Sequence, residues 1–284
     1  MSKRALVLGG GGVAGIAWET GLLVGLADAG IEINKADLFV GTSAGSAVAA
    51  QVTSGLSMEE LFQRQVDPAL QAKEIDVQPN FQQIVADFNR ITSEGHRGSA
   101  LMRELGKAAL STPTVPEAER RNVIVSRLPV HQWPQSRLEI VAVDAFSGER
   151  VVFTHESGVE LIDAVAASCA VPCVWPPVTI GERRYIDGGC YSAANADLAA
   201  GFEKVLIVQP EIPALLLVES LEEQIERLRQ NGAQVEVLSP NEVVKNALAA
   251  AGGNPLDPAL REISAKAGRE QARDEVARIA ALWR

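Results

Sequence analysis

The sequence predicts an α/β fold in which parallel strands are joined by crossover helices, and two observations support this. A short apolar strand, residues 5–8, leads through a run of glycines into a helical pattern at 16–29. A second strand, 37–40, leads through another glycine-containing turn into a helix of small residues at 44–54. Two consecutive strand–turn–helix units are typical of a sheet with parallel strands. Apolar residues make up 47% of the 284 residues, which suffices for a substantial core.

The middle of the chain is expected to contain helices and two β-hairpins. The segment 57–110 is mostly helical and charged, which fits a cap over a site and a peripheral insertion equally well. Strand patterns at 138–143 and 150–154 are separated by turn residues and predict the first hairpin. A short helix at 161–168 follows, and the second hairpin is expected to end at 185–186.

The last third of the chain is expected to complete the same domain. Strands are predicted at 204–209 and 234–238, with a helical stripe between them formed by Val218, Leu221, Ile225 and Leu228. A final amphipathic helix, with Gly268 as a candidate break, carries Leu260, Ile263, Val276, Ile279 and Trp283. No repeat or linker is found, so we expect one domain over 1–284, with its motifs at about 5–200 and with 201–284 completing the fold.

The charge balance excludes some classes of partner. With 26 basic and 36 acidic residues the net charge is −10, which argues against a nucleic-acid partner and allows only transient contact with a membrane surface. The adjacent pairs Arg120-Arg121 and Arg183-Arg184 are expected to be solvated. The N-terminus lacks the apolar stretch of a signal peptide, and no apolar run is long enough to span a bilayer.

The three cysteines, Cys169, Cys173 and Cys190, cannot all pair with one another, and no histidine lies near them in the sequence. They therefore indicate reduced thiols rather than a metal site. We expect a cytoplasmic protein without a metal or another cofactor.

The two glycine-containing turns suggest acyl-transfer chemistry. Residues 41–45 have the G-x-S-x-G form of a nucleophile elbow, in which a sharp turn between strand and helix exposes the hydroxyl of Ser43. Residues 9–15 offer backbone N–H groups that no side chain obstructs, which suits a developing negative charge. The sequence thus places a candidate nucleophile close to a candidate anion site.

The base that would activate Ser43 is less obvious. The three histidines, His96, His131 and His155, are expected on the surface, although a triad with His131 or His155 keeps the usual order of serine, acid and histidine. The alternative is Asp187, which follows a short strand and precedes two glycines. A carboxylate within hydrogen-bond reach of the serine can act directly as a general base.

Four motifs, in this order, resemble those of the patatin-like phospholipases, acyl hydrolases with a Ser–Asp dyad. They are the glycine turn at 9–15, the elbow at 41–45, the Ala-Ser-x-x-x-Pro motif at 167–172 and the Asp-Gly-Gly motif at 187–189. The resemblance implies a three-layer α/β/α fold with a mainly parallel central sheet. It also implies a lipid or other acyl ester as substrate.

The resemblance gives individual residues their roles. Ser43 would be the nucleophile and Asp187 the base. The oxyanion hole would be formed by the N–H groups of Gly10, Gly11 and Gly12, to which Ala44, directly after the nucleophile, can add another donor.

Near these motifs, three positions bear on the resemblance. Ala14 stands where the family often has a basic residue. Asn195 matches a frequent asparagine of the family, but Ala196 replaces the proline that usually accompanies it.

Two other functions compete with hydrolysis. The spacing of Gly10, Gly12 and Gly15 also satisfies the dinucleotide-binding pattern, with Glu32 as the acidic residue. Glu32, however, precedes the second strand, whereas the acid of that pattern should end it. The other alternative is a protein of the same fold that binds a lipid or a protein partner without turnover. Both candidate catalytic residues are present, which argues against this alternative.

Overall fold

A computed structural model describes residues 2–75, 77, 81–210 and 218–283. Its centre is an eight-stranded sheet in the order β5-β6-β3-β2-β1-β7-β8, with β4 also paired to β3. The strands are β1 (Arg4–Leu8), β2 (Leu38–Thr42), β3 (Leu138–Asp144), β4 (Arg150–Phe153), β5 (Val178–Ile180), β6 (Arg183–Asp187), β7 (Lys204–Val208) and β8 (Gln234–Leu238). The strands β8, β7, β1, β2 and β3 are mutually parallel, and β4, β5 and β6 form the antiparallel pairings. The predicted α/β class with a mainly parallel sheet is confirmed.

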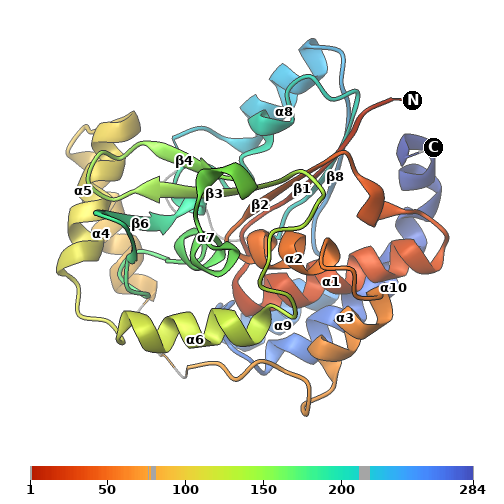
Figure 1. Ribbon diagram of the computed structural model, residues 1–284, viewed down its shortest axis with the longest axis horizontal. Coiled ribbons are helices and arrows are strands. Elements are labelled where there is room, and N and C mark those ends of the chain that lie inside the picture. Colours follow the sequence, from red (N-terminus) through yellow and green to blue (C-terminus); the bar gives the residue numbers. More distant parts are fainter. Residues whose placement is uncertain (1, 76, 78–80, 211–217, 284) are drawn as a thin grey trace.

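Helices cover both faces of the sheet, with α1, α2 and α10 on one face and α8 on the other (Figure 1). The helices are α1 (Gly12–Asp28), α2 (Ala44–Val52), α3 (Met58–Val66), α4 (Phe81–Ser93), α5 (Gly98–Ser111), α6 (Glu117–Arg127), α7 (Leu161–Ser168), α8 (Leu221–Gln230), α9 (Glu242–Ala250) and α10 (Leu260–Trp283). Among the described residues, no helix is both long and apolar enough to cross a membrane.

The core lies in two layers because successive side chains of a strand point to opposite faces of the sheet. On β1, Leu6 and Leu8 pack with the helices of one face, whereas Ala5 and Val7 belong to the cluster on the other face. All four are fully buried. A strand covered by helices on both faces must be apolar throughout, which explains the continuous apolar run at 5–8.

Helices α1 and α10 approach each other closely along glycines. A Cβ atom at Gly21 would lie 1.9 Å from the backbone oxygen of Ala265, and one at Gly268 would lie 2.4 Å from that of Trp18. The expected break near Gly268 is therefore wrong, because this glycine lies inside one continuous helix, Leu260–Trp283, where it allows the contact with α1.

Other differences from the sequence-based expectation concern element boundaries. Helix α1 begins at Gly12, inside the glycine turn, rather than at residue 16. Helix α8 begins at Leu221, so Val218 lies outside it and packs in a different apolar cluster from Leu221 and Leu228. Ile263 of α10 points outward and is 43% exposed. Helices α6 and α9 are not among the elements predicted from the sequence.

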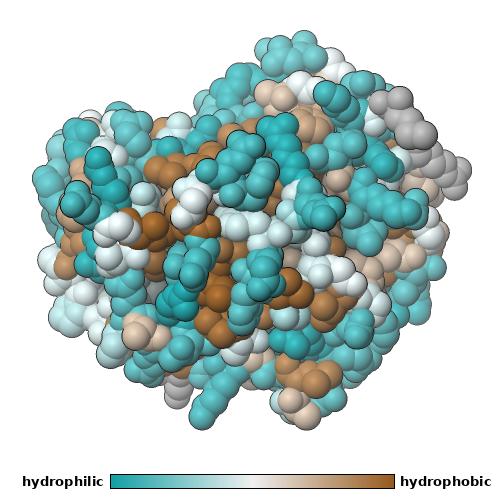
Figure 2. All heavy atoms as spheres, viewed as in Figure 1, coloured by the Kyte–Doolittle hydropathy of each residue, from teal (hydrophilic) through white to brown (hydrophobic). Residues whose placement is uncertain are grey.

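The predicted helical segment 57–110 contains α3, α4 and α5. Side chains of α4 and α5, such as Phe88 and Met102, pack in one cluster with Ile186 of β6 and Trp175. These helices therefore cover the edge of the sheet where β6 ends. Figure 2 shows hydrophobic residues in the middle of one face of the molecule, with hydrophilic residues around them.

Candidate active site

Ser43 occupies a strained turn between β2 and α2. Its backbone has φ 53° and ψ −118°, a conformation that costs energy for any residue other than glycine. The flanking glycines are required by close packing. A Cβ atom at Gly41 would lie 2.5 Å from Ser46 Cα, and one at Gly45 would lie 2.1 Å from the backbone oxygen of Leu8. Close packing on both sides thus keeps the nucleophile elbow in its strained conformation.

Three further side chains fix the backbone of Ser43, a role that their sequence pattern does not predict. The N–H of Ser43 donates to Ser168 Oγ at 2.9 Å. Its carbonyl oxygen accepts from Ser46 Oγ at 2.6 Å and from Cys169 Sγ at 3.2 Å. The motif at 167–172 therefore holds the elbow, since Ser168 and Cys169 both bond to it.

The glycine turn lies directly beside the nucleophile. A Cβ atom at Gly10 would be 3.4 Å from Ser43 Cβ, so a side chain there would crowd the hydroxyl. The N–H of Gly10 already donates to the carbonyl oxygen of Ala193 at 3.0 Å, which leaves it unavailable for an oxyanion in this state. The N–H groups of Gly11, Gly12 and Ala44 have no acceptor among the described residues. These three amides lie at or next to the N-termini of α1 and α2, where the helix dipoles favour an anion.

Asp187 ends β6 and is 3% exposed. Its Oδ1 accepts from the N–H of Gly189 at 2.7 Å, and its Oδ2 has no hydrogen-bond partner within the described part of the chain. Burial raises the pKa of Asp187 to about 7, while the Ser43 hydroxyl, the Gly189 N–H and the charge of Arg120 lower it by less. The carboxylate is thus a stronger base than an ordinary aspartate.

The sheet register brings Ser43 and Asp187 together. Strand β3 lies between β2 and β6, where Thr42 pairs with Val141 and Asp187 pairs with Ala142. The residue before the nucleophile and the acid thus flank neighbouring positions of one strand. The two candidate catalytic residues, far apart in sequence, meet across β3.

Asn195 links the two ends of this arrangement. It is fully buried in the left-handed conformation, with φ 53°. Its Nδ2 lies 3.0 Å from Thr42 Oγ1, 3.3 Å from the oxygen of Gly188 and 2.9 Å from that of Ser192. Since Thr42 precedes the nucleophile and Gly188 follows the acid, one amide group connects the side chain of Thr42 with the backbone of Gly188.

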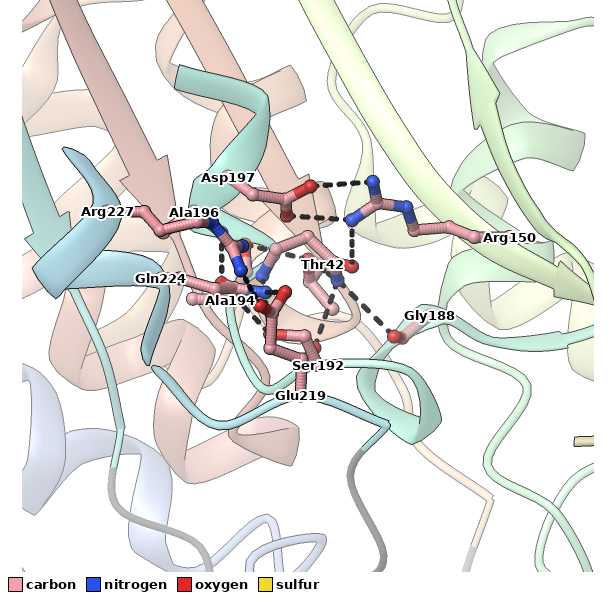
Figure 3. Close-up of polar contacts among 11 residues, drawn as sticks. Thr42, Arg150, Gly188, Ser192, Ala194, Ala196, Asp197, Glu219, Gln224 and Arg227 are labelled. Atoms are coloured by element: carbon pink, nitrogen blue, oxygen red, sulfur yellow. Dashed lines mark hydrogen bonds and ion pairs between the residues drawn. The ribbon is translucent and has the colours of Figure 1, made fainter. Parts of the chain in front are cut away.

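Arg150 supports Asn195 from the outside. Its Nη1 donates to Asn195 Oδ1 at 3.2 Å, and its guanidinium makes two hydrogen bonds of 2.7 Å with the carboxylate of Asp197. The guanidinium also lies 4.6 Å from the ring centre of Tyr191. Figure 3 shows Arg150 and Asp197 facing each other beside Thr42. A bidentate pair of this kind has a defined geometry, which restrains Asn195.

Replacing Asn195 with alanine is expected to lower the free energy of unfolding by about 2–4 kcal/mol. The substitution leaves several buried polar groups without a hydrogen-bond partner, and alanine must adopt the same strained backbone angle. Urea denaturation measures this loss. Asn122→Ala, on the exposed side of α6, is the matched control and should change stability by less than about 0.5 kcal/mol. Equal stability of the two variants would contradict the role of Asn195.

The histidines do not contribute to the site. The side chains of His96 and His155 are 37% and 65% exposed and lie near the surface carboxylates of Glu94 and Glu156, respectively. His131 is also exposed and contacts the carbonyl oxygen of Val125. The triad with His131 or His155 is therefore not formed.

The dinucleotide alternative also lacks support. Glu32 is exposed and precedes a short 3₁₀ turn, Ile33–Lys35, while β2 ends in the elbow.

Within the described ranges, no group of three or more histidine, cysteine, aspartate or glutamate side chains could hold a metal ion.

One expectation about charge is wrong at the site. The sequence predicts that Arg120 is solvated, but this residue is only 4% exposed, whereas Arg121 makes ion pairs with Asp163 and Glu160 at the surface. Arg120 is buried because α6 turns it inward, onto the ring of Trp175. Adjacent residues of a helix point in different directions, so the two members of the pair have different environments.

Comparison with known proteins places the chain in a family. A family model described as patatin-like phospholipase matches residues 6–200. Among solved structures, VipD from Legionella pneumophila aligns over 98% of this chain and 67% of its own, with 13% identity and a TM-score of 0.49. The type III effector protein ExoU aligns over 98% of this chain and 53% of its own, with 15% identity and a TM-score of 0.45. This chain thus spans about two thirds and about half of their lengths. None of the curated proteins matches the sequence.

Proposed function

Since this chain belongs to the patatin-like phospholipase family, and is therefore a hydrolase of lipid ester bonds, we propose that it works through a Ser43–Asp187 dyad and an acyl-enzyme. The observation that carries this proposal is the register of β2, β3 and β6, which brings a strained serine to a buried carboxylate. The substrate is a lipid or another acyl ester, and the chain's own residues supply all of the chemistry.

In the first half of the reaction, the Ser43 hydroxyl attacks the ester carbonyl carbon while Asp187 accepts the hydroxyl proton. The tetrahedral intermediate collapses when Asp187 returns this proton to the leaving alcohol, and the acyl group remains on Ser43. In the second half, Asp187 takes a proton from water, which attacks the acyl-enzyme. Collapse releases the carboxylic acid and restores the serine.

The oxyanion of both intermediates is stabilised by the N–H groups of Gly11, Gly12 and Ala44, which lack other acceptors among the described residues. Gly10 contributes by its lack of a side chain, because a Cβ atom there would lie 3.4 Å from Ser43 Cβ. Each such donor is worth about 2.7–4 kcal/mol of transition-state stabilisation.

A carboxylate can replace histidine here because of its environment. An ordinary aspartate is too weak a base for a serine hydroxyl near neutral pH. Burial brings the pKa of Asp187 to about 7, close to that of an imidazole. No histidine is then needed to accept the proton.

The proposed function is tested with p-nitrophenyl esters and phospholipid vesicles of graded acyl-chain length. We expect release of nitrophenol and fatty acid, and a fluorophosphonate probe should label Ser43, as mass spectrometry of the peptide would show. A protein that binds these lipids but neither hydrolyses them nor reacts with the probe would instead be a non-catalytic lipid binder.

The activity is expected to fall as the pH drops below about 7, since only ionised Asp187 accepts a proton. Below that point kcat/KM should decrease about tenfold per pH unit. Measurement of p-nitrophenyl ester hydrolysis from pH 5 to 9, with circular dichroism to verify folding at each pH, checks this. An acid limb near pH 4, as for an exposed aspartate, would contradict the assignment of a buried base.

A further inference from the structure

Arg120 is a buried cation with an incomplete set of partners. Its guanidinium carbon lies 3.8 Å from the ring centre of Trp175, and the residue is 4% exposed. Its Nε and Nη1 have no hydrogen-bond partner within the described part of the chain. A buried guanidinium is costly without a compensating anion, so its surroundings must supply one.

The nearest carboxylate compensates Arg120 only in part. Glu74 Oε2 lies 3.8 Å from Arg120 Nη1, too far for a hydrogen bond. The same carboxylate makes contacts of 2.6 Å with both Arg127 and Arg261. One negative charge is thus shared by three buried arginines, with the shorter contacts to the other two, and Arg120 retains an excess of positive charge.

Asp187 is a second anion that acts electrostatically on Arg120. The carbonyl oxygen of Ala170 accepts the N–H of Asp187 at 3.0 Å, and the N–H of Trp175 donates to Val171 at 2.9 Å. The short segment 170–175 therefore holds Asp187 at one end and carries the ring beneath Arg120 at the other. Arg120 and Asp187 act on each other electrostatically, since each favours the charged form of its partner.

The other titratable groups that face Asp187 carry no positive charge. Burial raises the pKa of the Cys169 and Cys190 thiols, and the charge of Asp187 raises both pKa values further, so both thiols stay neutral. Burial, and then the charge of Arg127, lower the pKa of Arg120 to about 9, so it stays protonated at neutral pH. The glycine turn adds no cation, because residues 9–15 include no basic side chain.

We propose that Arg120 is a positioning residue whose buried positive charge keeps Asp187 ionised and ready to accept the proton of Ser43. It supplies from α6 a cation that the glycine turn lacks. This inference rests on the proposed function, in which Asp187 is the base. The positive charge is held in place by the face of Trp175 and by the distant carboxylate of Glu74.

The test is the pH dependence of kcat/KM in variants of Arg120. Arg120→Met keeps an unbranched side chain on Trp175 but removes the charge, so the acid limb should move up by about one pH unit or more. Activity would then fall about tenfold at pH 6 and approach the wild-type value at pH 9. Arg120→Lys restores the charge and should bring the limb back toward the wild-type position.

Arg121→Met is the matched control, because this neighbour on α6 is ion-paired at the surface and should leave the limb unchanged. Thermal unfolding verifies that each variant is folded, and Arg120→Gln replaces the methionine variant if the latter does not fold. A loss of activity that is equal at every pH would mean a purely structural role and would overturn the inference. So would an unchanged limb in the folded neutral variants.

The failure of this inference can be told apart from that of the proposed function. If Asp187→Asn retains activity, Asp187 is not the base and the proposed mechanism fails. If Asp187→Asn is inactive while Arg120→Met keeps the wild-type acid limb, the dyad stands and only the role of Arg120 is excluded.

Discussion

Replacing Ser43 with alanine is expected to reduce kcat/KM for ester hydrolysis by about 10⁴-fold or more, because the variant cannot form the acyl-enzyme. Its free energy of unfolding should change little, since the backbone bonds of the elbow to Ser168, Ser46 and Cys169 remain. Initial rates with a p-nitrophenyl ester, together with urea denaturation, measure both quantities.

Ser54→Ala is the control for this substitution, because Ser54 lies just past α2 and its hydroxyl bonds only to its own neighbourhood. This variant should hydrolyse esters at the wild-type rate. Retention of more than about a tenth of the activity by Ser43→Ala would show that another group is the nucleophile, given the usual size of the effect.

Replacing Asp187 with asparagine should have the second largest effect, a loss of about 10³–10⁴-fold in kcat/KM. The amide has nearly the same shape and can still accept from Gly189, but it cannot take the serine proton. Labelling of Ser43 by a fluorophosphonate should slow in parallel. If the activity of this variant survived while His155→Ala lost it, the base would be a histidine instead.

The same substitution is expected to stabilise the protein at high pH. The pKa of Asp187 in the folded protein is about 7, above its ordinary value of 3.8, so the folded state binds the proton more tightly than the unfolded state. The stabilisation of the folded protein by the protonated carboxyl group is complete below pH 3.8 and is lost as the pH rises through about 7. Above that pH the ionised, buried carboxylate costs on the order of 4 kcal/mol, which asparagine avoids.

Thermal unfolding at pH 8 and pH 4 tests this consequence. The Tm of Asp187→Asn should exceed that of the wild type by several degrees at pH 8, with a much smaller difference at pH 4. Asp274→Asn, at an exposed position of α10, should show no such dependence. A variant less stable than the wild type at pH 8 would mean that the carboxylate is not buried in solution.

Local patterns were enough to predict much of the fold. Helix α7 and strand β8 have the predicted bounds, 161–168 and 234–238, and both hairpins are confirmed. In these elements the periodicity is strong and nearby turn residues mark the ends. The prediction failed at Gly268, because the effect of a glycine in a helix depends on the helix packed against it.

The candidate site likewise has features that local sequence patterns predict and features that depend on tertiary packing. The sequence by itself determined the elbow around Ser43 and the acid in Asp-Gly-Gly, since short-range sterics demand glycines at a sharp turn. Only the tertiary structure decided that the Gly10 amide bonds to Ala193, that Asn195 connects Thr42 with Gly188, and that Arg120 is buried. Turn geometry depends on neighbours in the chain. Burial, hydrogen-bond partners and charge environment depend on segments that only the packed sheet and helices bring together.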